Sequence, residues 1–357
     1  MKIIHCADLH LDSKLESNLD AYKAKERRSE ILDTFERMIE YAVNYDVTAI
    51  IIAGDMFDTA RIKSSTKSRI INTIRKNPQL DFLYLSGNHD EKNFINLIED
   101  KPENLKIFGH QWTSFQYENI NICGVVLDKN NSSLMYDTLY LNPNDFNIVV
   151  LHGQITNYNS KNDGENINLV KLKNKNIDYL ALGHIHSYEK NTLDERGVYC
   201  YSGCLEGRGF DECGEKGFVL LDIEKEKFVT EFIPFAKRKL VEFKFDITNY
   251  NDWFEIEEQI VKQINKIEKD NLVKIILKGR YNLKLDKHLS MLEKKLESFY
   301  FVKIKDESVL EVTPQDIEKD ISLRGEFIRK VLASNLSEEE KEYTILIGLK
   351  TLQGEDL

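Results

Sequence analysis

Apolar residues follow two alternating spacings along the first 235 residues of the chain. Some segments place them every three or four positions, as one face of a helix does, and others place them in short unbroken runs typical of buried strands. The segment Ala21–Tyr45 has the helical spacing, whereas Thr48–Ala53 has the pattern of a buried strand. Helix and strand alternate in this way in α/β layers. The pattern therefore predicts an α/β fold.

Strands dominate the pattern after about Leu105. The helices expected in residues 1–235 are Ala21–Tyr45 and Ser65–Asn77, the second of which is closed by Pro78. The expected strands are Lys2–Ala7, Thr48–Ala53, Asp81–Ser86, Ile120–Leu127, Asn147–Leu151, Tyr179–Leu182, Gly197–Tyr201, Gly217–Ile223 and Lys227–Pro234. The simplest packing of these elements is two sheets face to face with helices outside.

A domain boundary is expected near Phe235–Lys239, because a compact βαβαβ pattern begins beyond it. The expected elements are strand Leu240–Ile247, helix Asp252–Lys269, strand Leu272–Lys278, helix Asp286–Ser298 and strand Phe299–Lys305. The interpretation is a catalytic domain at 1–235 followed by a small α+β cap domain at 236–305.

The remaining residues, 306–357, are acidic and have a helical pattern. One apolar stripe consists of Leu323, Phe327, Ile328, Val331 and Leu332. Ser337 begins a further expected helix, because the segment Ser-Glu-Glu-Glu is a capping box. The stripe either packs within the chain or docks on a partner, and both readings stay open.

The charge of the chain is unevenly distributed. The formal net charge of −11 would disfavour a nucleic-acid partner, since phosphates are neutralised by Lys and Arg. Residues 236–305, however, carry 16 Lys and Arg against 11 Asp and Glu, a net charge of +5. This block is either a solvated surface or a surface for contact with phosphates.

Hydropathy and cysteine content indicate the compartment. No apolar run approaches the ~18 residues of a membrane span, and the N-terminal segment turns polar too soon for a signal peptide. The five cysteines include no Cys-x-x-Cys pair, which favours a reducing compartment over a disulfide framework or a structural zinc site. We therefore expect a cytoplasmic protein without a membrane partner.

Five polar fragments each follow directly on an expected strand, and together they contain five of the eight histidines. They are Asp8-Leu-His10, Gly54-Asp-Met-Phe-Asp58, Gly87-Asn-His-Asp90, Leu151-His-Gly153 and Gly183-His-Ile-His186. The carboxyl edges of parallel strands meet at one side of a sheet, so all five could converge. Asp, Asn and His without thiolates suit divalent manganese, iron or zinc.

This series of fragments resembles the calcineurin-like metallophosphoesterase family over residues 1 to about 235. The resemblance implies two divalent metal ions, which we expect to be Mn²⁺. It implies one site formed by Asp8, His10, Asp55 and His186, and a second formed by Asp55, Asn88, His152 and His184, with Asp55 bridging. Two such ions roughly 3.5 to 4 Å apart activate a bridging hydroxide for in-line attack on phosphorus.

The resemblance also implies a catalytic role for His89, which would stabilise the charge at phosphorus or protonate the leaving oxygen. Asp58 or Asp90 would then orient its imidazole. Some nuclease relatives carry a second histidine at the position of Asp58, so the proton-donor arrangement of this chain differs from theirs. The alternative role for Asp58 is a helix N-cap.

The phrases DYLALGHIHSYEK, YSGCLEGRGFDECGEKGF and LRGEFIR resemble the SbcD branch of DNA repair nucleases, and within it the bacterial exonuclease-like YhaO proteins. This likeness implies a DNA repair exonuclease acting at DNA ends, with a cap that engages DNA and a tail that docks on an SbcC-like coiled-coil ATPase. A homodimer is implied as well. Two alternatives stay open: a phosphodiesterase or phosphatase of small nucleotide substrates, and chiefly an assembly subunit of the ATPase complex.

The glycine-rich segment Ser202–Gly209 follows an expected strand and has a residue able to bind substrate. Arg208 would meet a phosphate if the backbone here approaches substrate. Equally, the segment would be only a tight hairpin. Cys204 and Cys213 are interpreted as small packing residues rather than as ligands.

Overall fold

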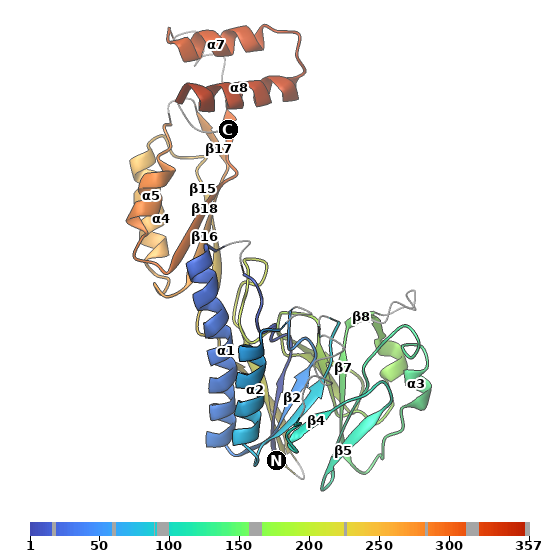
Figure 1. Ribbon diagram of the computed structural model, residues 1–357. Helices are drawn as coiled ribbons and strands as arrows, with labels where there is room; N and C mark the ends of the chain where they lie inside the picture. Colours follow the sequence, from blue (N-terminus) through green and yellow to red (C-terminus); the bar gives the residue numbers. More distant parts are fainter. Residues whose placement is uncertain are drawn as a thin grey trace. The chain divides into compact units, whose positions relative to one another are not determined.

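The computed structural model describes residues 1–15, 19–58, 62–88, 90, 100–156, 166–224, 227–282, 285–311 and 321–353 (Figure 1). The chain divides into two compact units, Met1–Lys239 and Leu240–Leu357. None of the helices in these described ranges combines the length and the apolar character that a bilayer crossing requires.

Two six-stranded sheets form the first unit. The first sheet has the order β14 (Lys227–Pro234), β13 (Gly217–Glu224), β1 (Lys2–Cys6), β2 (Val47–Ala53), β3 (Asp81–Leu85) and β4 (Leu105–Ile107). The second has the order β11 (Glu189–Thr192), β12 (Val198–Tyr201), β10 (Tyr179–Gly183), β7 (Phe146–His152), β6 (Ile120–Gly124) and β5 (Thr113–Tyr117). Strands β1 to β4 are parallel to one another, as are β6, β7, β10 and β12.

The two sheets pack face to face around a common core. Ile51 of β2, Val150 of β7 and Ala181 of β10 belong to this buried cluster. Figure 1 shows helices outside both sheets: α1 (Ala21–Asn44) and α2 (Ser64–Lys76) on the first, and α3 (Met135–Thr138) on the second. The predicted two-sheet sandwich flanked by helices is therefore confirmed.

Several short strands were not predicted, and their sequences explain why. All four side chains of β11, Glu-Lys-Asn-Thr, are exposed, so this edge strand has no apolar signal. The strand β5 has alternating half-buried and exposed side chains. Two further short strands, β8 (Gln154–Thr156) and β9 (Asn166–Asn168), pair only with each other. Hydrophobic patterning finds buried strands better than polar edge strands.

The second unit contains the predicted βαβαβ order. Its parallel sheet consists of β15 (Leu240–Asp246), β16 (Leu272–Lys278) and β18 (Phe301–Asp306), with helices α4 (Trp253–Ile264) and α5 (Leu289–Lys295). A separate pair is formed by β17 (Arg280–Asn282) and β19 (Val309–Glu311). Both helices are shorter than predicted. In α4, for example, the helix ends before Asn265 although the predicted range reached Lys269.

Two helices complete the second unit, α7 (Leu323–Leu332) and α8 (Glu338–Gln353). The apolar stripe of α7 is divided between two environments. Ile328 and Val331 pack against Ile345 of α8, whereas the side chain of Leu323 is 72% exposed. Packing within the chain therefore accounts for the middle of the stripe and leaves its first residue on the surface.

A buried ion-pair network attaches α1 to the loop that contains Arg208. The guanidinium of Arg27 donates to Glu30 at 2.6 Å, to Glu206 at 2.9 Å and to the carbonyl oxygen of Gly207 at 3.1 Å. Arg238, which lies near the C-terminal end of the unit's sequence, also donates to Glu30. Burial raises the pKa of Glu30, but the hydrogen bonds from Arg238, Lys237 and Arg27 outweigh it and lower the value to about 2.

Substitution Arg27→Ala should reduce the free energy of unfolding by about 3–5 kcal/mol, because it removes the guanidinium paired with the buried carboxylate of Glu206 and one of the cations at Glu30. The matched control is Arg75→Ala, whose ion pair with Asp100 is at the surface and should contribute no more than about 1 kcal/mol. Urea unfolding of both variants measures the difference. Equal losses would show that the buried network has no special role in stability.

Candidate metal centre

The carboxyl ends of five strands meet where the two sheets pack together. Asp8, Asp55 and Asn88 follow β1, β2 and β3 of the first sheet, while His152 ends β7 and His184 follows β10 of the second. These strands are neighbours within each sheet, and β2 packs against both β7 and β10 across the sandwich. The described residues of all five polar fragments are therefore brought to one edge.

Backbone strain is concentrated at this edge. Four non-glycine residues there have left-handed backbone angles: φ is 51° at Asp8, 44° at His10, 49° at Asp55 and 102° at His184. Each such residue costs about 1–3 kcal/mol, and residues of this kind cluster at functional sites. These backbone angles let the chain turn sharply after each strand, so that the side chains of these residues lie close together.

Glycines in three of the fragments make room for the neighbouring site residues. A Cβ atom on Gly54 would lie 2.0 Å from Nδ1 of His152, and one on Gly87 would lie 2.1 Å from Oδ1 of Asp55. A Cβ atom on Gly183 would meet the carbonyl oxygen of Ala53 at 1.9 Å. Any larger residue at these positions would displace the side chains or backbone of the site.

Two groups of ligand-type atoms are formed. In the first, Asp8, His10 and His186 place one ligand atom each within 4.8 Å of one another, and Nε2 of His10 lies 3.2 Å from Nε2 of His186. In the second, Asp8, Asp55 and His152 do the same within 4.8 Å. Asn88 joins the second group, since its Oδ1 lies 3.0 Å from Nε2 of His152.

Asp55 lies between the two groups. Its Oδ2 atom is 3.9 Å from Nε2 of His10 and 3.3 Å from Nε2 of His152. The ring of His184 packs edge-on against that of His152, with centroids 5.4 Å apart, and its backbone N–H donates to Asp8. The arrangement matches the chemistry of a pair of divalent cations that share one carboxylate.

The electrostatics of the site favour bound positive charge. Asp8 and Asp55 are each only 1% exposed. Burial raises the pKa of Asp8, while the charges of His152 and His186 act in the opposite direction. Burial lowers the pKa of His152, but its hydrogen bond to Asp55 and the nearby carboxylate charges outweigh burial and raise the pKa to about 9. A divalent cation would take over the role of that proton.

Polar contacts at Nδ1 orient three of the histidines so that Nε2 faces the site. The Nδ1 atom of His152 lies 2.9 Å from the carbonyl oxygen of Ala53. That of His186 lies 2.7 Å from Oε1 of Glu212, and that of His10 lies 3.2 Å from Oδ1 of Asp58. Such outer partners fix the tautomer and orientation of metal-binding histidines. Each imidazole therefore presents its other nitrogen as a ligand.

Arg208 connects the two outer carboxylates. It donates from Nη1 to Asp58 at 2.8 Å and from Nη2 to Glu212 at 2.9 Å. Burial raises the pKa of Glu212, but the hydrogen bond from His186 and the charge of Arg208 lower it to about 2. Its partners therefore place Arg208 behind the histidines, and the loop around it is the one held by Arg27.

The structure corrects the alternative role considered for Asp58. Asp58 is not the N-cap of α2, because that helix begins at Ser64 and its N-cap is Lys63. Asp58 contacts His10, and this hydrogen bond, followed by the charge of Arg208, lowers its pKa. His89, the predicted catalytic histidine, lies outside the described residues.

Asp90 has a structural environment that the sequence did not indicate. Its carboxylate is buried and accepts hydrogen bonds from the backbone N–H groups of Phe57 at 2.9 Å and Gly87 at 2.8 Å. Burial raises the pKa of Asp90, and these two backbone hydrogen bonds oppose the shift. Asp90 therefore ties the second polar fragment to the third.

Glu212 is the site residue that sequence analysis missed. It is 26 residues from His186, and it lies in a turn rather than after a strand. A search for polar residues directly after strands could therefore not have identified Glu212. Cys204, four residues before Arg208, is buried with its thiol directed to the carbonyl oxygen of His186, which agrees with the predicted packing role.

Comparison with known proteins gives relatives over most of the chain. The protein named DNA double-strand break repair protein Mre11 of Sulfolobus acidocaldarius is 22% identical, over 94% of this chain and 90% of its own length. The protein of the same name from Saccharolobus solfataricus is 23% identical, over 100% of this chain and 96% of its own length. The uncharacterized metallophosphoesterase YhaO of Bacillus subtilis is 25% identical, over 78% of this chain and 72% of its own length.

A family comparison covers the part of the chain that contains the metal-ligand fragments. The family described as calcineurin-like phosphoesterase matches residues 1–188, which is more than half of the chain. The match extends from β1 to just beyond His186, so it includes every residue of the two ligand groups. The resemblance noted in the sequence is confirmed, and the chain belongs to the calcineurin-like phosphoesterase family.

Proposed function

We propose that this metallophosphoesterase is a two-metal-dependent phosphodiester hydrolase that acts as an exonuclease at DNA ends. The observation that supports the two-metal reaction best is the position of the Asp55 carboxylate between His10 and His152. A carboxylate has two oxygens and can serve two cations, so this position suits a bridging ligand.

The proposed ligands are those expected from the sequence. Asp8, His10, Asp55 and His186 would hold one ion, and Asp55, Asn88, His152 and His184 would hold the other. The oxygen and imidazole donors, without thiolate, suit Mn²⁺ among the divalent ions. Two bound dications would polarise a phosphoryl oxygen and lower the pKa of a water molecule.

The protein's own residues would act by holding the ligands in place. Asp58 and Glu212 fix the two histidines of the first group, and Arg208 fixes both carboxylates. Arg208 is thus proposed to act mainly through these contacts, with a phosphate contact as a second role.

His89 is the proposed proton donor to the leaving oxygen. Its two neighbours are fixed, Asn88 by the contact with His152 and Asp90 by two backbone N–H groups.

A DNA substrate is supported by two observations. Two relatives that cover nearly the whole chain carry the name DNA double-strand break repair protein. The block of residues 236–305 has a net charge of +5, from 16 Lys and Arg and 11 Asp and Glu, which suits a phosphate backbone.

The proposed partner is an SbcC-like coiled-coil ATPase that docks on the tail through exposed apolar residues such as Leu323, and a homodimer is proposed with it. The five free cysteines suit the reducing cytoplasm, which is the proposed location.

An alternative function is hydrolysis of small phosphate esters, which is favoured by the acidic charge of residues 1–235.

Asp55→Asn should abolish tight binding of Mn²⁺, because it removes the charge shared by both groups. Glu212→Gln should weaken binding by roughly 10–100-fold, since Glu212 is not itself a proposed ligand and acts by orienting His186. The control is Glu215→Gln, whose partner Lys239 is at the surface, and it should bind as the unmodified protein does. Calorimetric titration measures all three, and wild-type affinity in Asp55→Asn would exclude the proposed bridging role.

His89→Asn should lose turnover of DNA by about 100-fold or more, as expected for a general acid, while its Mn²⁺ content stays unchanged. Metal analysis and a nuclease assay on 5′- and 3′-labelled linear DNA measure the two properties on the same sample. Unchanged turnover would assign proton transfer to another group.

Truncation after Lys239 should separate the two candidate substrates. The cut is placed there because Lys237 and Arg238 bind Glu30 and belong to the first unit. The shortened chain should hydrolyse bis-p-nitrophenyl phosphate at the full rate and lose most of its DNA cleavage. Cooperative thermal unfolding serves as the folding control. Retention of DNA cleavage would remove the proposed role of the basic block.

A further inference from the structure

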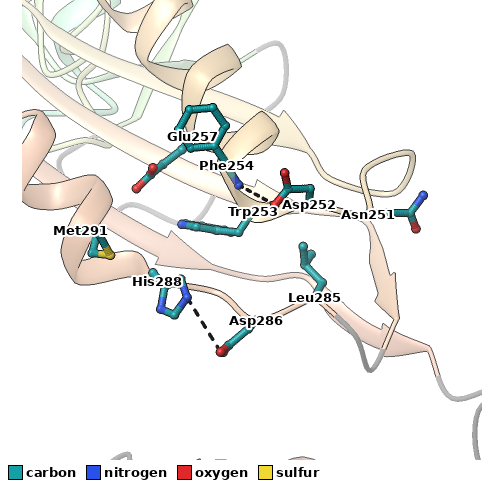
Figure 2. A pocket seen from close by; sticks show the side chains of 9 residues that line it. All are labelled: Asn251, Asp252, Trp253, Phe254, Glu257, Leu285, Asp286, His288 and Met291. Atoms are coloured by element: carbon teal, nitrogen blue, oxygen red, sulfur yellow. Dashed lines mark hydrogen bonds and ion pairs between the residues drawn. The ribbon is translucent and has the colours of Figure 1, made fainter.

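A pocket of about 300 Å³ lies in the second unit, beside the beginnings of α4 and α5. Trp253, Glu257 and Leu285 are its buried residues, with exposed fractions of 5%, 3% and 5%. Met291 and Phe254 at the rim are exposed. Figure 2 shows these residues around the pocket, with α4 contributing one wall. The pocket thus has a buried floor and an open edge.

Two polar atoms in the floor have unmet hydrogen-bonding capacity. Among the described residues, nothing pairs with Nε1 of Trp253 or with Oε1 of Glu257, although both atoms are buried. The other oxygen of Glu257 is bound by Lys295. A buried donor or acceptor without a partner is destabilising. This pair therefore indicates a ligand that both accepts and donates a hydrogen bond.

The two atoms belong to the same face of the pocket. Trp253 and Glu257 are four residues apart on α4, which places their side chains on one side of the helix. In Figure 2 the nitrogen of the indole and the carboxylate of Glu257 lie toward the same end of the pocket, near His288 and Met291. A single extended group could therefore engage both.

The charge of the pocket selects the type of ligand. Three carboxylates line it, those of Asp252, Glu257 and Asp286. Lys295 pairs with one oxygen of Glu257, and the imidazole of His288 lies 3.8 Å from Asp286, so the lining stays acidic. The surrounding block of residues 236–305 is basic, so this acidic corner stands apart from it. Carboxylates repel phosphate groups and attract cations. The lining therefore disfavours a nucleotide and favours a cationic group.

We propose that this pocket binds an arginine side chain within a peptide segment of a partner protein. The guanidinium donates to Oε1 of Glu257, and a peptide carbonyl oxygen accepts from the indole N–H of Trp253. The methylene groups of the arginine pack on Leu285 and Met291. Arginine suits the site better than lysine, because its planar guanidinium has several donors and is less strongly hydrated. The exposed side chains of Met291 and His288 shift to admit it.

The test uses the tryptophans of the full-length chain, of which there are only two. In the Trp112→Phe protein, Trp253 is the sole indole and its fluorescence reports the pocket. The probe is the blocked peptide acetyl-Gly-Arg-Gly-amide, and its counterpart contains citrulline, which has the same shape without the charge. We expect a saturable change with the arginine peptide and binding at least about tenfold weaker with the citrulline peptide.

Variants in the same background locate the binding. Glu257→Gln should lose the response, while Glu258→Gln, an exposed position on the same helix outside the pocket, should keep it. Asp286→Lys changes an exposed rim residue without disturbing the core and should weaken binding at least about tenfold. The proposal is overturned by equal binding of the arginine and citrulline peptides, by absence of saturation, or by saturation with a mononucleotide instead. Thermal unfolding confirms that each variant is folded.

Discussion

The structure depends most on the burial of two carboxylates, Asp8 and Asp55, where the two sheets meet. Carboxylates are seldom buried unless a cation or several hydrogen-bond donors compensate their charge. Here the compensation comes from His152, from His10 and from backbone N–H groups. His152 and His10 are themselves ligand-type residues, and the backbone N–H that donates to Asp8 belongs to His184, another one. The same charge that makes the edge of the sandwich costly to fold makes it a place for divalent cations.

Other features of the first unit follow from this constraint. Left-handed backbone angles bring Asp8, His10 and Asp55 into range of one another within a few residues of the strand ends. Glycines before Asp55 and Asn88 leave space for the facing side chains. Behind the histidines, Arg208 joins Asp58 to Glu212, so the first group is held from outside as well. The side chains of the first group are thus held by contacts within the protein itself.

Sequence patterns were sufficient to predict the buried central strands and the polar residues that follow them. Buried runs such as those of β2 and β10 located the central strands, and the polar residues after them located seven proposed ligands. Patterns did not reveal Glu212, which does not follow a strand, and they did not reveal that Asp58 contacts His10, because that pair is joined only by the fold. The pairing of polar edge strands such as β11 was also invisible, since all its side chains are exposed. The acidic pocket beside α4 likewise depends on two helices that are distant in sequence.

The order of the strands has a consequence for how the protein is made. Strand β1 lies in the middle of its sheet and pairs with both β2 and the much later β13. The nascent chain therefore carries a half-paired central strand until Gly217–Glu224 has been synthesised. Because domains generally fold as units, the ligand-type groups, which run from Asp8 to His186, come together only after most of the first unit has been synthesised. The proposed ions would therefore bind late in biosynthesis.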